Sequence, residues 1–274
     1  MMVAAPGRCV MQLQFVRLFF LLVLISLSAC GGGDDGGGAL VFEETELFSC
    51  ELPAGNHTQL TVEAVNGEIT ITGESDADSV MITAIKRVQS KIDAQDAKDH
   101  LQELVVNCES LENTVFVETI QPDDTVDRNY IVDYTITLPT YFMVQVDSIN
   151  GIVTLDSIEN DVTVNMVNGE VTLSNIHGGA LVGLANGTID SEVVLPLQGT
   201  IDLKVATGGD IQLAIPTNTS ATFSATTLFG VINISSNLVL QDVVETSTSL
   251  SGTLGSGDGE ISLGTMGDIY VSGF

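Results

Sequence analysis

The chain has 274 residues, of which 44% are hydrophobic and only 16% are charged. This balance excludes a wholly disordered chain, because disorder requires few apolar and many charged residues. Thirty-six acidic residues against eight basic ones give a net charge of −28, which repels phosphate backbones and excludes nucleic acid as a partner.

Residues 1–29 have the pattern of a lipoprotein signal peptide. Arg8 and Arg17 supply a positive start, and an uninterrupted apolar run follows at 18–27. That run is too short to span a membrane and is typical of a signal peptide. Met11 would give a more compact leader and is an alternative start.

The residues Leu-Ser-Ala-Cys at 27–30 resemble a bacterial lipobox, in which the peptidase cuts before the cysteine and Cys30 becomes acylated. Several acyl chains anchor a protein stably to a membrane. Gly31 follows the cysteine, and by resemblance to Gram-negative lipoproteins this implies transfer to the outer membrane. Residues 30–40, rich in glycine and aspartate, are expected to tether the folded domain to the lipid.

Two cysteines lie in the body of the chain, Cys50 and Cys108. An even pair in an exported protein predicts one disulfide, with two buried free thiols as the alternative. The chain has no Cys-x-x-Cys motif, so neither a zinc site nor thioredoxin-type chemistry is indicated.

The first half of the body alternates between apolar and polar residues, as strands do. The strands expected there cover residues 60–65, 68–72, 80–88, 115–120 and 130–138.

Residues 93–105 differ, because Ala94, Ala97, Leu101 and Leu104 form one apolar stripe at helical spacing. We expect one short helix there, packed on its own sheet rather than on a partner protein.

From residue 148 the chain becomes repetitive. Aligned positions at residues 151, 161, 169, 179 and 187 are alternately 10 and 8 residues apart, which gives an 18-residue repeat. Glycine, often after asparagine, suits a corner that requires positive φ. The glycines expected as structural corners are Gly67, Gly151, Gly169, Gly187, Gly209 and Gly230.

A fixed period near 20 predicts an all-β fold, a parallel β-solenoid whose short strands are joined by Asn-Gly corners. Valine, isoleucine and leucine at alternate positions would point inward, and threonine and acidic residues outward. An antiparallel meander is the alternative, because Asn-Gly is also a strong hairpin signal. The regular alternation of spacing favours the solenoid.

The order of these features resembles the bacterial putative adhesin family, a β-solenoid domain family of unknown function. An Asn-Gly strand and the alanine-striped helix precede residues 134–139, the Asn-Gly repeats, and then residues 213–216 and 221–225. The resemblance covers residues 41–274, expected to form a single domain with N-terminal strands and helix at 41–147 and regular repeats at 148–274. It implies no catalytic residues and no cofactor. The interval 230–259 departs from the repeat and is interpreted as an inserted loop.

Few residues point to chemistry. His57, His100 and His177 lie outside any metal-binding spacing, so we expect them to face solvent and predict no metal site. The acidic segments 74–78 and 123–127 are interpreted as solvated turns, with calcium binding as the alternative.

Together these features predict a lipid-anchored, non-enzymatic envelope protein whose solenoid presents a surface for adhesion or interaction. Its partners would be the membrane, through the N-terminal lipid, and an envelope or matrix glycan or protein. It would be an outer-membrane lipoprotein facing the periplasm or the cell exterior. The alternatives are a polysaccharide-active β-helix enzyme, which residues 148–274 disfavour because Lys204 is their only basic residue, and a structural or regulatory envelope component.

Overall fold

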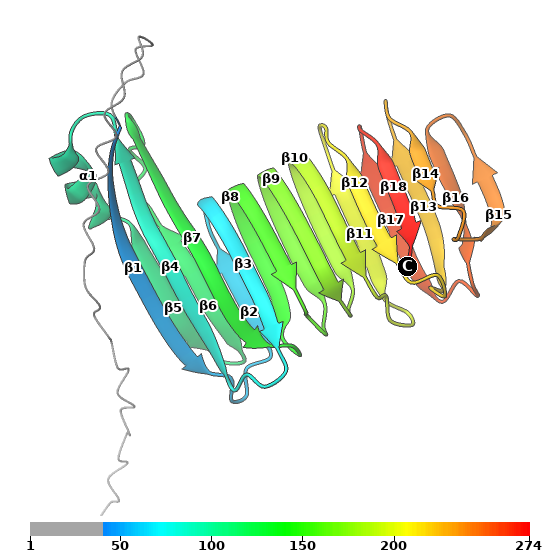
Figure 1. Ribbon diagram of the computed structural model, residues 1–274, viewed down its shortest axis with the longest axis horizontal. Coiled ribbons are helices and arrows are strands. Elements are labelled where there is room, and N and C mark those ends of the chain that lie inside the picture. Colours follow the sequence, from blue (N-terminus) through cyan, green and yellow to red (C-terminus); the bar gives the residue numbers. More distant parts are fainter. Residues whose placement is uncertain (1–40) are drawn as a thin grey trace, which may run out of the picture.

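The computed structural model describes residues 41–274, and the expected signal peptide, Cys30 and the tether lie outside them. The described chain forms strands and one helix (Figure 1). The elements are β1 (Phe42–Pro53), β2 (Gln59–Glu63), β3 (Asn66–Glu74), β4 (Ser79–Ser90), α1 (Ala94–Leu101), β5 (Val105–Leu111), β6 (Thr114–Ile120), β7 (Arg128–Pro139), β8 (Met143–Asp156), β9 (Val162–Ile176), β10 (Ala180–Val193), β11 (Thr200–Val205), β12 (Ile211–Ile215), β13 (Ala221–Thr227), β14 (Ile232–Ile234), β15 (Leu240–Glu245), β16 (Ser249–Leu254), β17 (Gly259–Thr265) and β18 (Ile269–Gly273).

The strands form two layers that share the long strands β8, β9 and β10. Layer 1 runs β5–β6–β2–β8–β9–β10–β11–β17–β13–β16–β15. Layer 2 runs β1–β4–β7–β3–β8–β9–β10–β12–β18–β14. Each long strand contributes its first half to layer 1 and its second half to layer 2. The strands stack side by side, which makes the molecule elongated, with β1 at one end and β15 at the other (Figure 1).

The core lies between the two layers, and β8 shows how the sequence builds it. Val144 and Val146 are buried in its first half, and Val153 and Leu155 in its second half, so the buried set changes from even to odd positions. This change brings both halves to face one interior, because successive side chains of a strand point to opposite faces. Buried residues from both layers accordingly form one continuous core cluster.

The pairing is parallel throughout the middle of the stack and antiparallel only toward its ends, in β1–β4, β4–β7, β5–β6, β13–β16 and β15–β16. A mostly parallel sheet is therefore confirmed, and the antiparallel meander is wrong for the central repeats. Each of the five strands expected in the first half of the body is also present, as β2, β3, β4, β6 and β7.

One turn of the chain through layer 1 and then layer 2 is called a coil. The order of the coils in space differs from their order in the chain. The last coil, β17 and β18, lies between the β11–β12 coil and the β13–β14 coil. The early coil of β2 and β3 lies between β6 and β7 on one side and β8 on the other. The C-terminal coil and the early coil of β2 and β3 therefore both lie in the interior of the stack, whereas β1 stays at its edge.

The helix is shorter than expected from the apolar stripe. It covers Ala94–Leu101, with Asp93 as its N-cap accepting from the backbone N–H of Asp96. Leu104 is still fully buried, but it lies beyond the helix because the chain must enter β5 at Val105. The helix packs at the β1 and β4 end of layer 2 (Figure 1).

Residues 230–259 are not an inserted loop, and that expectation is wrong. They contain β14, β15 and β16, which complete the end of the stack. β16 pairs with β13 in reverse direction, which is why the parallel repeat pattern is lost here. The boundary expected between residues 147 and 148 also falls within the single strand β8.

Candidate functional site

The glycines of the four expected Asn-Gly corners lie inside strands rather than in turns, whereas Gly209 lies between β11 and β12. Gly67, Gly151, Gly169, Gly187 and Gly209 all have positive φ, between +118° and +148°. They stack in one column, since Gly151 pairs with Gly67 and Gly169 with Gly151 across the parallel strands. This column marks where the chain passes from layer 1 to layer 2.

Gly230 lies in the same column with a different backbone. It has no positive φ, and its neighbour is Gly267, which in turn follows Gly209. A Cβ atom on Gly230 would collide with the carbonyl oxygen of Gly267. Close approach of the backbones, rather than φ, therefore disfavours a side chain here.

The asparagines before these glycines form a hydrogen-bonded ladder. Asn186 Nδ2 donates to Asn168 Oδ1 (2.9 Å), Asn168 to Asn150 (2.8 Å) and Asn150 to Asn66 (2.7 Å). Asn66 ends the ladder by donating to the carbonyl oxygen of Tyr130 (3.0 Å). All the amides point in one direction, so each bond polarises the next and supports the register of the coils.

Cys50 and Cys108 form a disulfide, with their Cα atoms 6.6 Å apart. Cys50 lies in β1 and Cys108 in β5, the outermost strands of layer 2 and layer 1 at one end of the stack. The bond therefore joins the two layers where no further coil covers them.

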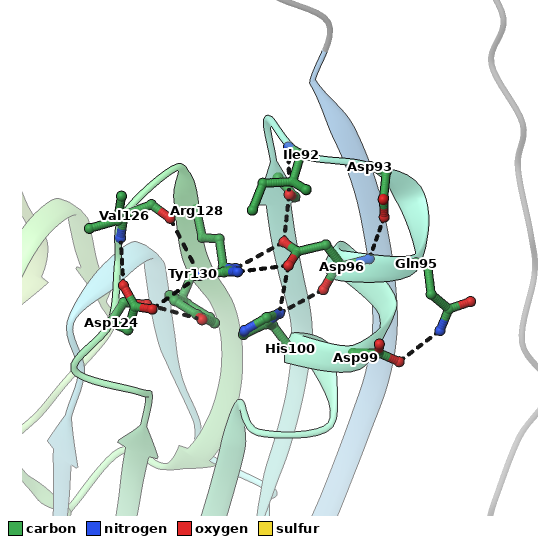
Figure 2. A network of polar contacts seen from close by, with 11 residues as sticks. Ile92, Asp93, Gln95, Asp96, Asp99, His100, Asp124, Val126, Arg128 and Tyr130 are labelled. Carbon is green, nitrogen blue, oxygen red and sulfur yellow. Dashed lines mark hydrogen bonds and ion pairs between the residues drawn. The ribbon is translucent and has the colours of Figure 1, made fainter.

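A polar network holds α1 against layer 2 (Figure 2). Arg128 donates to both carboxylate oxygens of Asp96, from Nε (2.9 Å) and Nη2 (2.7 Å), and Ser90 Oγ donates to Asp96 (2.6 Å). His100 Nδ1 lies 2.8 Å from the Asp96 carbonyl oxygen, and Arg128 also contacts Asp124 (3.3 Å).

These contacts shift the ionisation of the paired groups. Hydrogen bonds from Arg128 and then Ser90 lower the pKa of Asp96 from 3.8 to about 2, and the hydrogen bond to Asp96 raises the pKa of Arg128. Asp96 is thus an ionised anchor for the helix. Its side chain is one-seventh exposed and its hydrogen-bonding groups are paired, which indicates a structural role.

The histidines do not all face solvent as expected. His100 is half-buried in this network, and His57 is half-buried beside β5, with Nε2 2.7 Å from Ser110 Oγ and Nδ1 3.0 Å from the Ala54 carbonyl oxygen. His177 is exposed and contacts Asn175 (2.9 Å). Sequence spacing gave no sign of the Ser110–His57 contact, because 53 residues separate the pair.

The acidic segments 74–78 and 123–127 lie in the turns before β4 and β7. Asp124 accepts from the backbone N–H of Val126 (3.1 Å) and from Arg128, which is the bonding of a turn. Within residues 41–274, no group of three or more His, Cys, Asp or Glu side chains could hold a metal ion.

The outer surface of layer 2 carries a continuous line of polar side chains, which we call the polar row. It takes one residue from each of the ten strands of the layer, and the pairing register places each beside the next. In spatial order the polar row consists of Ser49, Thr83, Thr135, Thr70, Thr154, Thr172, Asp190, Gln212, Tyr270 and Asn233. The polar row cannot be recognised in the sequence, because it crosses strands whose spatial order the sequence does not reveal.

The described part of the chain contains no helix with the length and apolar character needed to cross a membrane.

The chain is similar to several solved structures of low sequence identity. A putative cell adhesion protein from Clostridium sporogenes is 12% identical over 84% of this chain and 100% of its own, with a TM-score of 0.50. A putative adhesin from Bacteroides fragilis is 12% identical over 82% and 97%, with a TM-score of 0.31. A putative lipid binding protein from Parabacteroides distasonis is 12% identical over 83% and 96%, with a TM-score of 0.30. No curated protein matches the chain.

A family model described as Toastrack DUF4097 matches residues 28–272, nearly the whole chain. The resemblance expected from the order of the sequence features is confirmed, and the chain belongs to the Toastrack DUF4097 family.

Proposed function

We propose that this protein is a lipid-anchored, non-enzymatic component of the bacterial envelope that binds a partner through the outer surface of layer 2. The observation that carries the proposal is the polar row, because it is the longest uninterrupted line of hydrogen-bonding side chains that the register brings together. Side chains on either side of each row residue point into the core, so the row rests on a rigid support.

The chemistry of the polar row favours recognition of a polar partner. Five adjacent strands contribute threonine, from Thr83 to Thr172, and their hydroxyl groups can both donate and accept hydrogen bonds. Such surfaces bind polar partners directly and through bridging water. The similar Clostridium sporogenes structure is named for cell adhesion, which agrees with this role.

The proposed anchor is Cys30, which would place the protein in the outer membrane with its domain facing the periplasm or the exterior. Cys30→Ser should shift the full chain from the membrane to the soluble fraction or stall its processing, while Cys9→Ser in the leader should change neither. Mass spectrometry of the N-terminal peptide checks the acylation. A membrane-bound Cys30→Ser chain, or an unmodified Cys30 peptide in the wild type, would contradict the anchor.

The binding role is tested by retention of purified envelope polysaccharide and matrix fractions on the immobilised full chain. We expect at least one fraction to be retained without release of shorter products. Failure to retain any fraction would instead support a purely structural envelope component.

One observation favours the enzymatic alternative, namely the contact between Ser110 and His57. A serine nucleophile needs such a base, and His57 Nε2 is placed to accept its proton. The other ring nitrogen faces the backbone carbonyl oxygens of Pro53 and Ala54. Ser110 lines neither the hollow of ≈ 380 Å³ beside Asp147 nor the one of ≈ 410 Å³ beside Gln212. A fluorophosphonate probe should therefore leave Ser110 unlabelled; labelling that disappears in His57→Ala would overturn the non-enzymatic assignment.

A further inference from the structure

The polar row changes character where it crosses the C-terminal half of layer 2. Threonines give way to Asp190, Gln212, Tyr270 and Asn233, on β10, β12, β18 and β14. Neighbouring strands lie about 4.8 Å apart, so these four side chains span roughly 14 Å across the strands. That is the length of a short linear oligomer.

A groove of ≈ 410 Å³ follows this part of the row. It is hollow because Ala214 and Ser272, which pair with each other, are small residues two positions beyond Gln212 and Tyr270 on the same outer surface. The groove therefore has polar side chains along one border and small side chains in its floor.

Tyr270 supplies an oriented aromatic ring at the groove. Its side chain is 42% exposed, and its hydroxyl donates to Asp268 Oδ2 (2.9 Å), two residues earlier in the chain. This bond fixes the hydroxyl end of the ring along its own strand, and the exposed ring lines the groove. Asp268 is fixed in turn, because its Oδ1 accepts from the backbone N–H of Val231 (2.8 Å).

The remaining border groups are free to bind. Asp190, Gln212 and Asn233 are exposed, and their side chains make no hydrogen bond to another described residue. A carboxylate and two amides provide both donors and acceptors.

We propose that this groove binds a linear glycan of neutral or amino sugars. Sugar hydroxyl groups both donate and accept, which matches the amides and the carboxylate, and the C–H face of a sugar ring packs on an aromatic face such as that of Tyr270. A folded protein partner fits less well, because a stable protein interface buries roughly 800 Å² on each partner, and this groove of ≈ 410 Å³ is bordered by polar side chains. Asp190 and the overall charge of −28 repel sugars that carry carboxylates. This inference rests on the proposed binding role of layer 2.

The test uses the full chain with three probes of equal length: chitohexaose, cellohexaose and hexagalacturonate. Calorimetry should detect chitohexaose or cellohexaose and not hexagalacturonate. Tyr270→Ala should weaken that binding at least tenfold, Gln212→Ala should also weaken it, and Tyr270→Phe should keep most of it because the ring remains. Tyr141→Ala is the matched control, since Tyr141 is similarly exposed (45%) but lies outside the groove. Thermal melts establish that each variant is folded.

Three outcomes would overturn the glycan groove: no binding of either uncharged probe, equal binding of the acidic one, or binding that Tyr270→Ala and Gln212→Ala leave unchanged. The proposed function is judged separately by retention of envelope fractions. Retention that persists in Tyr270→Ala would keep the binding role and remove only this groove.

Discussion

At the residue scale, Gly169 shows why the Asn-Gly pattern recurs. Its φ is +148°, and a Cβ atom there would collide with the carbonyl oxygen of Gly151 in the neighbouring coil. Both the local conformation and the spacing of the coils therefore exclude a side chain.

Gly169→Ala should thus lower the free energy of unfolding by about 1 kcal/mol or more. Gly183→Ala is the matched control, because Gly183 has no positive φ and its nearest contact for a new Cβ is Asn165 Oδ1 at 3.6 Å. Urea unfolding of both variants checks the difference. Equal stabilities of the two variants would show that the glycine column is not a structural requirement. If Gly169→Ala kept full stability but lost partner binding, the column would have a role in binding.

Asp96 gives the domain a specific acid sensitivity. Its pKa is lowered from 3.8 to about 2 in the folded chain, so the folded state favours the carboxylate. The stabilisation is complete above about pH 4 and is lost as the pH falls toward 2, because protonation then costs less in the unfolded chain.

Asp96→Asn should therefore lower the urea midpoint at pH 7, and the gap from the wild type should close as the pH approaches 2. Asp99→Asn on the same helix is the control, since Asp99 is exposed and its side chain hydrogen-bonds only to Gln95 (2.7 Å). A gap that stays constant from pH 7 to pH 2 would mean that the Asp96 charge does not secure α1.

At the element scale, the disulfide between β1 and β5 is placed where the stack has no covering coil. Cross-linking residues 58 positions apart restricts the unfolded chain and stabilises the fold by about 4 kcal/mol in the chain-entropy model. Replacing both Cys50 and Cys108 with alanine should lower stability by that order, and a reductant should then have no further effect. Alkylation of the denatured, unreduced wild type provides the independent check: two modified thiols would contradict the bond.

The other end of the stack needs protection against pairing with another chain, because β15 is an open edge with exposed Val243 and Val244. Two features oppose such pairing: a register shift between Gln241 and Val244, with Asp242 at φ +50°, and the charges of Asp242 and Glu245.

Removing these charges, in Asp242→Asn with Glu245→Gln, should increase self-association, as measured by sedimentation velocity over a range of concentrations. The control removes the same charge from interior strands, in Glu170→Gln with Glu192→Gln. If both double variants associate equally, net charge rather than edge protection keeps the chains apart.

The elements that local sequence pattern determines are predictable from the sequence. The alternation of Leu60 with Val62, and of Ile69 with Ile71, predicts β2 and β3 correctly because each strand has one buried face. The strands within residues 230–259 are not predictable in this way, because β15 is exposed along nearly its whole length and no apolar alternation marks it. The C-terminal end of α1 could not be predicted from the apolar stripe. Val105 pairs with Ile120, 15 residues away, and this pairing of β5 with β6 ends the helix before the stripe ends.

The candidate groove could not be predicted for a different reason. Gln212 and Tyr270 are 58 residues apart and become neighbours only because the last coil enters the stack beside β12. An 18-residue repeat indicates that coils stack, but it does not state the order in which they do so.

At the scale of the whole molecule, this order separates the protein from a linear repeat protein. In a linear solenoid each repeat contacts only its sequence neighbours, so a terminal repeat can be removed and the rest still folds. Here the C-terminal coil of β17 and β18 is an interior coil, with β11 and β12 on one side and β13 and β14 on the other. Ile261, Leu263, Ile269 and Val271 are almost fully buried within it.

Truncation after Leu254 should consequently unfold the C-terminal half of the stack, with loss of hydrogen-exchange protection in β11, β12 and β13. The comparison is a chain in which residues 228–256 are replaced by a short glycine-serine linker. That change removes more of the chain but only from the end of the stack, since β14, β15 and β16 cover no coil beyond themselves. It should leave protection in β11 and β12 intact. The opposite result would be a folded truncated chain and an unfolded linker chain. It would mean that β14, β15 and β16, rather than the coil of β17 and β18, hold the stack together.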